Sequence, residues 1–402
     1  MHNNAFRLPG DTIITSILLA LFACAKFLNL IVLSAYPSLA GKFMTAMYIV
    51  VLSLLLYTGL IRQRRNILRL APSHILILLL CVLWYLFTYI FVDIPSVSFP
   101  FFFIFTLSSF IIPGIVYFNA RIFLLTLMII PSIGVLYLDQ LMLNLVLESG
   151  TFSLGASYAI LIPVIANLVY VKFYYMKESF CIKILLLPFM GVNLYYLVQM
   201  AVLGSRGPML CVVLLLASLL LVKVDKNSAI TIRTGRAFIF ICFAVIIALA
   251  FKPFLIMLSN FLASFDITLN VVDKFLIMDG YGDMTNGRKV ISDITWEAIS
   301  RSPFWGYGIA QFENNTGIIY PHNFVLQFIY DGGFIMASCV MIPIIVAINR
   351  KIRVLQLDNI ACLLFFAFAS VPGALFSGDL WQSSMLWMFF GYVLSRNSLL
   401  IS

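Results

Sequence analysis

Apolar runs of about 20 residues recur along the whole chain and set its predicted architecture. This is the length that a helix needs to cross ~30 Å of hydrocarbon, and the runs are continuous where membrane strands would alternate. We therefore predict an all-α polytopic membrane protein with 12 transmembrane helices. The predicted spans are 12–34, 42–61, 73–92, 97–118, 121–138, 153–171, 184–203, 208–222, 237–257, 324–348, 357–376 and 380–396.

One long hydrophilic loop, from 258 to 321, interrupts the apolar pattern between the ninth and tenth spans. Apolar residues recur at helical spacing within 265–276 and again within 291–298. The second stretch follows a polar start at Thr285–Asn286, which is suited to capping a helix. We predict a helical loop that divides the chain into three parts: transmembrane helices 1–9 in 1–257, the loop in 258–321, and helices 10–12 in 322–402.

Composition supports a membrane protein, because 63% of the residues are hydrophobic and only 10% are charged. Soluble domains carry roughly 25% charged residues. The net charge of +9 fits membrane topology better than nucleic-acid binding: with a cytoplasmic N-terminus, 17 of the 25 Lys and Arg lie on the cytoplasmic side. Seven lie outside, and Lys26 falls within the first span. We therefore expect both termini in the cytoplasm and the long loop on the periplasmic side.

The cysteines indicate neither disulfides nor metal binding. Six of the seven lie in apolar runs, and Cys181 lies in a short basic loop. The chain has no zinc-ligand spacing and no glycine-rich phosphate loop, so we expect no cofactor. The first apolar run is long and lacks a small-residue cleavage site, which favours a first transmembrane helix over a signal peptide.

His322 is the one histidine of three that is placed for chemistry at the outer face. It follows Tyr320–Pro321, where the long loop re-enters the membrane. Imidazole titrates near neutral pH, which suits a general base. The alternative is an interfacial histidine that caps the following helix.

Two arginines are candidates for binding an anion. Arg206 lies in the very short outer turn Leu203–Pro208, and an arginine at membrane depth is costly and is usually paired or functional. Arg288 and Lys289 begin the second helix of the loop. Together with that helix N-terminus, these cations would suit a diphosphate. The alternatives are that Arg206 snorkels to lipid phosphate and that Arg288 lies on a solvated helix face.

The order of these segments resembles the O-antigen ligase and Wzy polymerase superfamily. The resemblance covers about residues 200–335, and the N-terminal half is similar only as a set of helices. The segments are Ser205-Arg206-Gly207, Asn286-Gly287-Arg288 with Trp296, Ser302-Pro303-Phe304-Trp305-Gly306-Tyr307-Gly308, Pro321-His322-Asn323 and Gly332-Gly333. The span count and the late outer loop are also typical of that family.

The resemblance implies a metal-independent, inverting glycosyltransferase that uses glycans carried on undecaprenyl diphosphate. In this interpretation His322 takes a proton from the acceptor hydroxyl, while Arg206 and Arg288 hold the diphosphate. Asn323 or a carboxylate would orient the imidazole; the candidates are Asp283, Asp293, Glu297 and Glu313. The expected substrate-binding residues are Lys289, Asn286, Tyr281, Trp305, Tyr307, Tyr320 and Asn323, with an interfacial aromatic belt as the alternative for the rings.

The function that this resemblance favours is O-antigen polymerase, acting at the periplasmic face of the bacterial inner membrane. Pro321–Phe324, followed by Leu326-Gln327, is slightly more similar to the polymerase branch. The first alternative is O-antigen ligase, which transfers glycan to lipid A-core. A sugar transporter or flippase and a non-catalytic scaffold remain as other classes. The expected partners are lipid-linked glycan donor and acceptor, the lipid bilayer and a chain-length regulator, with no nucleic acid.

Overall fold

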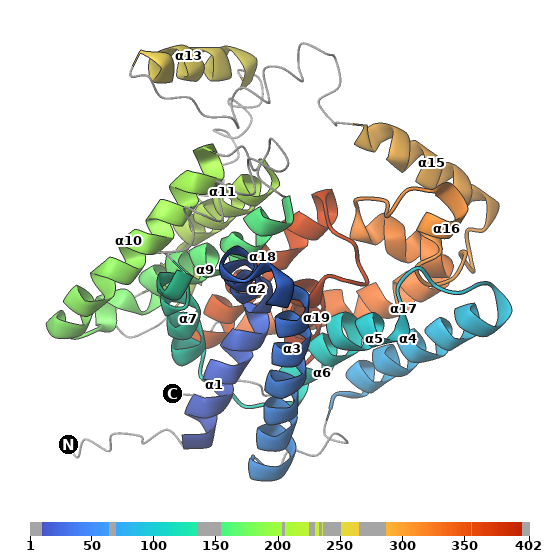
Figure 1. The fold of residues 1–402 in the computed structure, drawn as a ribbon, viewed down its shortest axis with the longest axis horizontal. Helices are drawn as coiled ribbons and strands as arrows, with labels where there is room; N and C mark the ends of the chain where they lie inside the picture. The colour runs from blue at the N-terminus through green and yellow to red at the C-terminus, as the bar shows by residue number, and fades with distance from the viewer. Residues whose placement is uncertain are drawn as a thin grey trace.

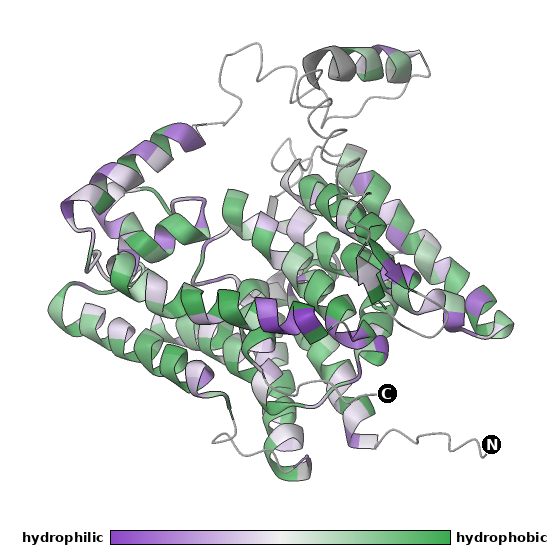
Figure 2. Ribbon diagram, turned by 180° about the vertical axis from the view of Figure 1, so that it is seen from behind, coloured by the Kyte–Doolittle hydropathy of each residue, from purple (hydrophilic) through white to green (hydrophobic). Residues whose placement is uncertain are grey.

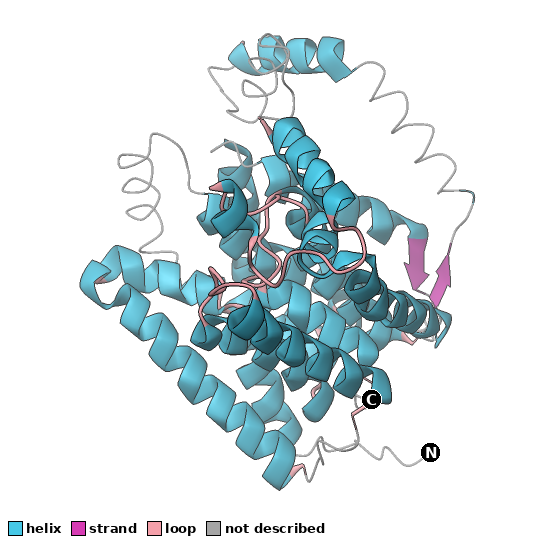
Figure 3. Ribbon diagram, turned by 90° about the vertical axis from the view of Figure 1, so that its right-hand side faces the viewer, coloured by secondary structure: helices cyan, strands magenta, loops and turns pink. Residues whose placement is uncertain are grey.

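The computed structural model describes residues 10–63, 70–134, 154–202, 206–224, 230–232, 235, 251–264, 287–354 and 356–395. Nearly all of this described chain is helix, as Figure 3 shows. The α-helices are α1 (Gly10–Ala23), α2 (Ala25–Ala35), α3 (Ala40–Leu56), α4 (Pro72–Phe91), α5 (Phe99–Phe101), α6 (Ser109–Ile115), α7 (Ala120–Ile129), α9 (Leu154–Phe173), α10 (Phe180–Val202), α11 (Arg206–Leu221), α13 (Phe251–Ala263), α15 (Arg288–Arg301), α16 (Phe312–Thr316), α17 (Phe324–Val354), α18 (Leu357–Phe376) and α19 (Ser384–Leu394).

Short turns of tighter or wider helix join some of these elements. They are η1 (Pro37–Leu39), η2 (Tyr57–Arg62), η4 (Phe102–Ser108) and η5 (Tyr175–Lys177). A two-stranded antiparallel ribbon, β1 (Val222–Val224) with β2 (Ile230–Ile232), follows α11. The apolar pattern did not predict this ribbon, because a three-residue strand is too short to show alternation.

Eleven of the twelve predicted spans coincide with helices of the described chain. Six of these helices are long and apolar enough to cross a membrane, or seven if the bent pair α1 and α2 forms one span. An all-α multi-pass membrane protein is therefore confirmed, and Figure 2 shows hydrophobic residues along most helices. Most of the ninth predicted span, 237–257, lies outside the described residues. The count of twelve stays a prediction.

The first predicted span is a broken helix. The axes of α1 and α2 differ by 62°, and the break lies at Cys24. Lys26 lies in the first turn of α2, directly after this break. The helix break therefore lies beside Lys26, the cation that the sequence places within the first span.

The core of the bundle surrounds α19, which lies among α6, α17 and α18 (Figure 1). Every residue of α19 is buried. A side chain at Gly391 would lie 2.0 Å from the carbonyl oxygen of Phe110, so this glycine permits α19 to approach α6 closely. Near the start of α19, Trp381 stacks on Trp387 at 5.7 Å and meets the edge of Phe328. Aromatic packing thus fixes the start of α19 against α17.

A break within α17 positions the loop that precedes it. Gly333 has φ +64 and interrupts the helix. The amides of Tyr307 and Gly308 donate to the carbonyls of Tyr330 and Asp331 at 2.9 and 2.8 Å, and Phe334 N donates to Pro303 O at 2.8 Å. The segment 302–308 is thereby joined to α17 through its backbone.

A buried carboxylate joins α7 to the start of α10. Glu178 is 2% exposed and accepts hydrogen bonds from Arg121 and from the Tyr170 hydroxyl, the latter at 2.6 Å. The Arg121 guanidinium is 52% exposed. The pair is therefore half desolvated, and Glu178 depends on both donors.

Replacing Glu178 with Ala should destabilise the fold, because the Tyr170 hydroxyl and the Arg121 guanidinium lose their shared acceptor. We expect a cost of about 2 kcal/mol, less than for a fully buried pair because the guanidinium is half-exposed. Thermal unfolding in detergent micelles would measure it. Glu297→Ala, which removes the exposed pair with Arg301, is the matched control and should leave the midpoint unchanged. Equal midpoints for both variants would refute a stabilising role for Glu178.

Candidate active site

The segment before α17 holds His322 in an unusual backbone conformation. His322 has φ +58, a left-handed conformation that non-glycine residues adopt only in a few per cent of cases. The next residue, Asn323, accepts hydrogen bonds through Oδ1 from the amides of Val325 and Leu326 at 2.9 and 3.2 Å. Asn323 therefore caps α17 and fixes the turn that carries His322. This Oδ1 is committed to the cap, so the structure does not bring it to the imidazole.

The environment of His322 favours the neutral imidazole. Its side chain is half-buried, its Nδ1 is buried without a hydrogen-bond partner among the described residues, and the Tyr320 ring meets it edge-on at 4.4 Å. Desolvation and, secondly, the Arg288 guanidinium lower the pKa of His322 below its usual 6.5. The ring is thus unprotonated near pH 7, and Nε2 is the nitrogen that can meet a substrate.

Ser377 joins Arg288 to the His322 segment. Arg288 begins α15 directly after Gly287, which adopts φ +77 at the N-cap position that we had expected for Thr285–Asn286. The Arg288 guanidinium donates to Ser377 Oγ at 3.3 Å. The Tyr320 hydroxyl donates to the Ser377 carbonyl at 3.2 Å. Arg288 and Tyr320 lie 89 and 57 positions from Ser377 in the sequence, and both contact the short turn that follows α18.

The helix that begins at Arg206 reaches the same turn. A side chain at Gly207 would lie 2.2 Å from the Tyr158 hydroxyl and 3.8 Å from Ser377 Oγ. On its other side, Tyr158 packs against Gly373 of α18. Tyr158 is thus wedged between two glycines and holds the start of α11 beside Ser377. The Arg206 side chain lies outside what the structure describes, but its backbone directly precedes this contact.

Asp379 adds a carboxylate that the sequence analysis missed. Its Oδ1 accepts from Gln327 Nε2 at 2.9 Å and from Trp381 N at 3.0 Å. Desolvation and, secondly, the charge of Asp379 raise the pKa of Tyr320. Desolvation raises the pKa of Asp379, and the two hydrogen bonds together with Lys26 partly offset this rise. The sequence does contain an indication of Asp379 as a site residue: Ser377-Gly378-Asp379 is a polar turn between two apolar runs, like the turn that contains Arg206. Tyr158 lies within an apolar run and gave no signal.

Several predicted substrate-binding residues lie apart from this cluster. Lys289 is exposed, and Trp305 is 65% exposed. Tyr307 stacks on Tyr330 at 4.8 Å and donates to Ala298 O at 2.9 Å, so it joins α15 to α17. Tyr281, Asp283 and Asn286 lie outside the described residues.

The carboxylates proposed to orient the imidazole are exposed where the structure describes them. They are Asp293, Glu297 and Glu313, and Glu297 pairs with Arg301. None of the three is among the groups that shift the pKa of His322. Among the described residues, no group of three His, Cys, Asp or Glu side chains could hold a metal ion. Metal independence stays a prediction.

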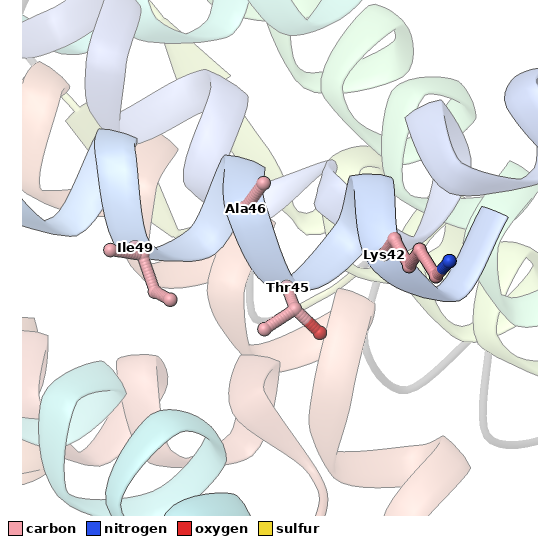
Figure 4. A pocket seen from close by; sticks show the side chains of 4 residues that line it. All are labelled: Lys42, Thr45, Ala46 and Ile49. Carbon is pink, nitrogen blue, oxygen red and sulfur yellow. The ribbon is translucent and has the colours of Figure 1, made fainter. Parts of the chain in front are cut away.

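A hollow of the described surface on α3 is separate from these residues. It has a volume of about 440 Å³ and is lined by Lys42, Thr45, Ala46 and Ile49, all from α3 (Figure 4). None of the candidate residues lines it. We therefore locate the candidate site by the convergence of polar groups on Ser377, not by the size of a hollow.

The sequence of this region matches a known family. Residues 191–341 match the family model described as O-antigen ligase. This match supports the O-antigen ligase and Wzy polymerase superfamily. The resemblance inferred from the motifs is thus confirmed, although the match does not distinguish the polymerase branch. No curated protein matches the chain significantly.

The matched segment contains Arg206, Arg288 and His322 but only part of the cluster. Tyr158 precedes the matched segment, and Ser377 and Asp379 follow it. Such a match supports transfer of a glycan in general. The geometry adds Ser377, which contacts Arg288 and Tyr320, and Tyr158, which lies against Gly207.

Replacing Gly207 with Ala should displace the start of α11, because the new methyl group would overlap the Tyr158 hydroxyl. We expect glycan transfer to fall at least about tenfold, since a displacement of ~1 Å can cost 10²-fold in rate. Adding Tyr158→Phe removes the clashing oxygen and leaves the nearest ring atom at 3.2 Å.

The double variant Gly207→Ala/Tyr158→Phe should therefore recover activity if Tyr158 acts through the shape of its side chain. Activity is measured per molecule of folded protein in membranes. The Tyr158→Phe single variant is the control, and a loss there would mean that the hydroxyl itself is required. Full activity of the Gly207→Ala single variant would disprove the close contact.

Proposed function

We propose that this protein is an O-antigen polymerase. It transfers a growing glycan from undecaprenyl diphosphate to a sugar hydroxyl of another lipid-linked repeat unit. The observation that carries this proposal is the convergence of Arg288, the start of α11 and the His322 segment on Ser377, within an O-antigen ligase-family domain.

The cations suit a diphosphate leaving group. Arg288 begins α15 and Arg206 begins α11, so each of the two arginines stands at a helix N-terminus. Each feature favours bound phosphate oxygens, and arginine binds them in a bidentate manner. As the anomeric carbon–oxygen bond breaks, its electron pair passes to the diphosphate. The cations stabilise the charge that develops there.

His322 supplies the proton acceptor in this proposal. The acceptor hydroxyl oxygen forms the new bond to the anomeric carbon, and its proton passes to Nε2 of His322. The neutral state of the ring at pH 7 supports this role. Attack in line with the departing diphosphate is a single displacement, so the anomeric configuration inverts. No metal ion takes part in any step of this scheme.

O-antigen ligase is the second candidate, because the matching family model carries that description. The donor and the chemistry would be the same, and the acceptor would be lipid A-core. Both activities belong at the periplasmic face of the inner membrane, where the positive charges of the sequence predict the long loop. A polymerase would act with a chain-length regulator, which we include in the proposal.

Replacing His322 with Ala should abolish transfer without changing the amount of protein in the membrane. In a strain that lacks the gene, wild type should restore a ladder of lipopolysaccharide chains, and the variant should give core with a single repeat. Bare core with accumulated lipid-linked polymer would identify a ligase instead. An unchanged ladder would overturn the proposed base.

The wild-type kcat/KM, measured at limiting donor, should fall on acidification with a midpoint below pH 6.5, because it reports the free protein, in which the pKa of His322 is lowered. Below that pKa the imidazole is protonated and cannot accept the proton.

Replacing Arg288 with Lys should reduce turnover at least about tenfold, because an ammonium cannot bind two phosphate oxygens as a planar fork. The measurement is release of undecaprenyl diphosphate by purified protein. Arg301→Lys, at the exposed end of the same helix, is the matched control and should behave as wild type. Equal rates for both variants would mean that Arg288 is only a surface cation.

A further inference from the structure

Gln327 is a buried polar side chain of α17 that the proposed reaction does not use. It lies five residues after His322 and is 2% exposed. Its Oε1 accepts from the amide of Leu380 at 2.8 Å, and its Nε2 donates to Asp379 Oδ1 at 2.9 Å. A backbone amide can only donate and a carboxylate oxygen accepts, so this orientation of the carboxamide satisfies both partners. Gln327 therefore binds two successive residues of the turn after α18.

A second side chain on the same face of α17 binds the next residue of that turn. Asp331 lies four residues after Gln327 and is fully buried. Its Oδ2 accepts from the indole N–H of Trp381, which is also fully buried. The Trp381 carbonyl accepts from Thr106 Oγ1 of η4 at 2.6 Å. Residues 379–381 are thus joined to α17 by two side chains that lie side by side on one helical turn.

The same turn of α17 also binds the segment that follows α15. Segment 302–308 donates two backbone hydrogen bonds to carbonyls of this turn. It comes directly after α15, whose first residue, Arg288, donates to Ser377 Oγ at 3.3 Å. Ser377 lies two residues before Asp379. Both partners of the Arg288–Ser377 hydrogen bond are therefore attached, through neighbouring segments of the chain, to residues 327–331 of α17.

We propose that Gln327 is a positioning residue for glycan transfer, because it fixes the turn that carries Ser377 to the helix that begins after His322. Through Ser377 it keeps the Arg288 guanidinium at a set distance from the proposed base. The inference rests on the proposed function. Gln327 touches no substrate in this scheme. Loss of its carboxamide would leave two buried groups of the turn each without one partner, and the turn would shift to regain them.

The first test compares Gln327→Met with wild type and with Gln356→Met. Methionine keeps the length of the side chain and removes both hydrogen bonds. Gln356 is exposed and accepts from Asn359 in the first turn of α18, so its replacement is the matched control. With saturating lipid-linked glycan, release of undecaprenyl diphosphate per molecule of folded protein should fall at least about tenfold in Gln327→Met, since a displacement of ~1 Å can cost 10²-fold. Gln356→Met should match wild type. A wild-type rate in Gln327→Met would overturn the inference.

A double-mutant cycle with Ser377→Ala tests whether Gln327 acts through this turn. Ser377→Ala removes the hydrogen bond from Arg288 and should itself reduce the rate roughly tenfold, as expected for a hydrogen bond to a charged group. If Gln327 positions Ser377, the double variant Gln327→Met/Ser377→Ala should be at most about twofold slower than the slower single variant. Losses that multiply in the double variant would mean that the two side chains act independently. That result, or a wild-type rate in Ser377→Ala, would contradict the inference.

An exchange of donor and acceptor provides a rescue that does not depend on how well Gln327→Met folds. Gln327→Glu places a second carboxylate against Asp379 and should lose activity. Adding Asp379→Asn restores a donor at this contact, with the same total charge as wild type, and should raise the rate about threefold or more above that of Gln327→Glu. A double variant no faster than Gln327→Glu would refute the positioning role, while wild-type release stays intact. Absence of undecaprenyl diphosphate release by wild type would instead overturn the proposed function, and the inference with it.

Discussion

The candidate site depends on the hydrogen bonds that compensate the break in α17. A helix interrupted at Gly333 leaves the carbonyls of Tyr330 and Asp331 without their usual donors. Both groups lie inside the bundle, where unsatisfied backbone costs several kcal/mol. The amides of Tyr307 and Gly308 satisfy them. A side chain at Gly306 would lie 2.5 Å from Gly333 N, so the approach requires glycine.

This constraint sets the relative positions of the proposed catalytic groups. Segment 302–308 begins directly after α15, whose first residue is Arg288. The break in α17 lies eleven residues after His322, on the same rigid element. When the loop docks onto the break, α15 and the start of α17 are joined at a fixed distance. Two motifs of the sequence, Gly306 to Gly308 and Gly332-Gly333, thus form one contact, although neither touches a substrate in our scheme.

The sequence predicted the helices of this protein far better than the side-chain contacts between them. Apolar length located the helices, and the polar re-entry located His322, because both are local signals. The orienting role expected for Asn323 conflicts with its Oδ1 capping α17, a competition that the motif alone does not reveal. The sequence analysis did not identify Ser377, Asp379 and Tyr158, because each acts on groups more than 45 residues away in the chain. Such contacts depend on which helices pack together.

The electrostatics of the site couple binding to basicity in the proposed reaction. Arg288 lowers the pKa of His322 in the free protein, so the empty site holds a weak base. A bound diphosphate carries at least two negative charges and lies against the same guanidinium. It cancels and then reverses the field that Arg288 exerts on the imidazole, and the proton affinity of His322 rises. The base is therefore strongest when the donor is in place.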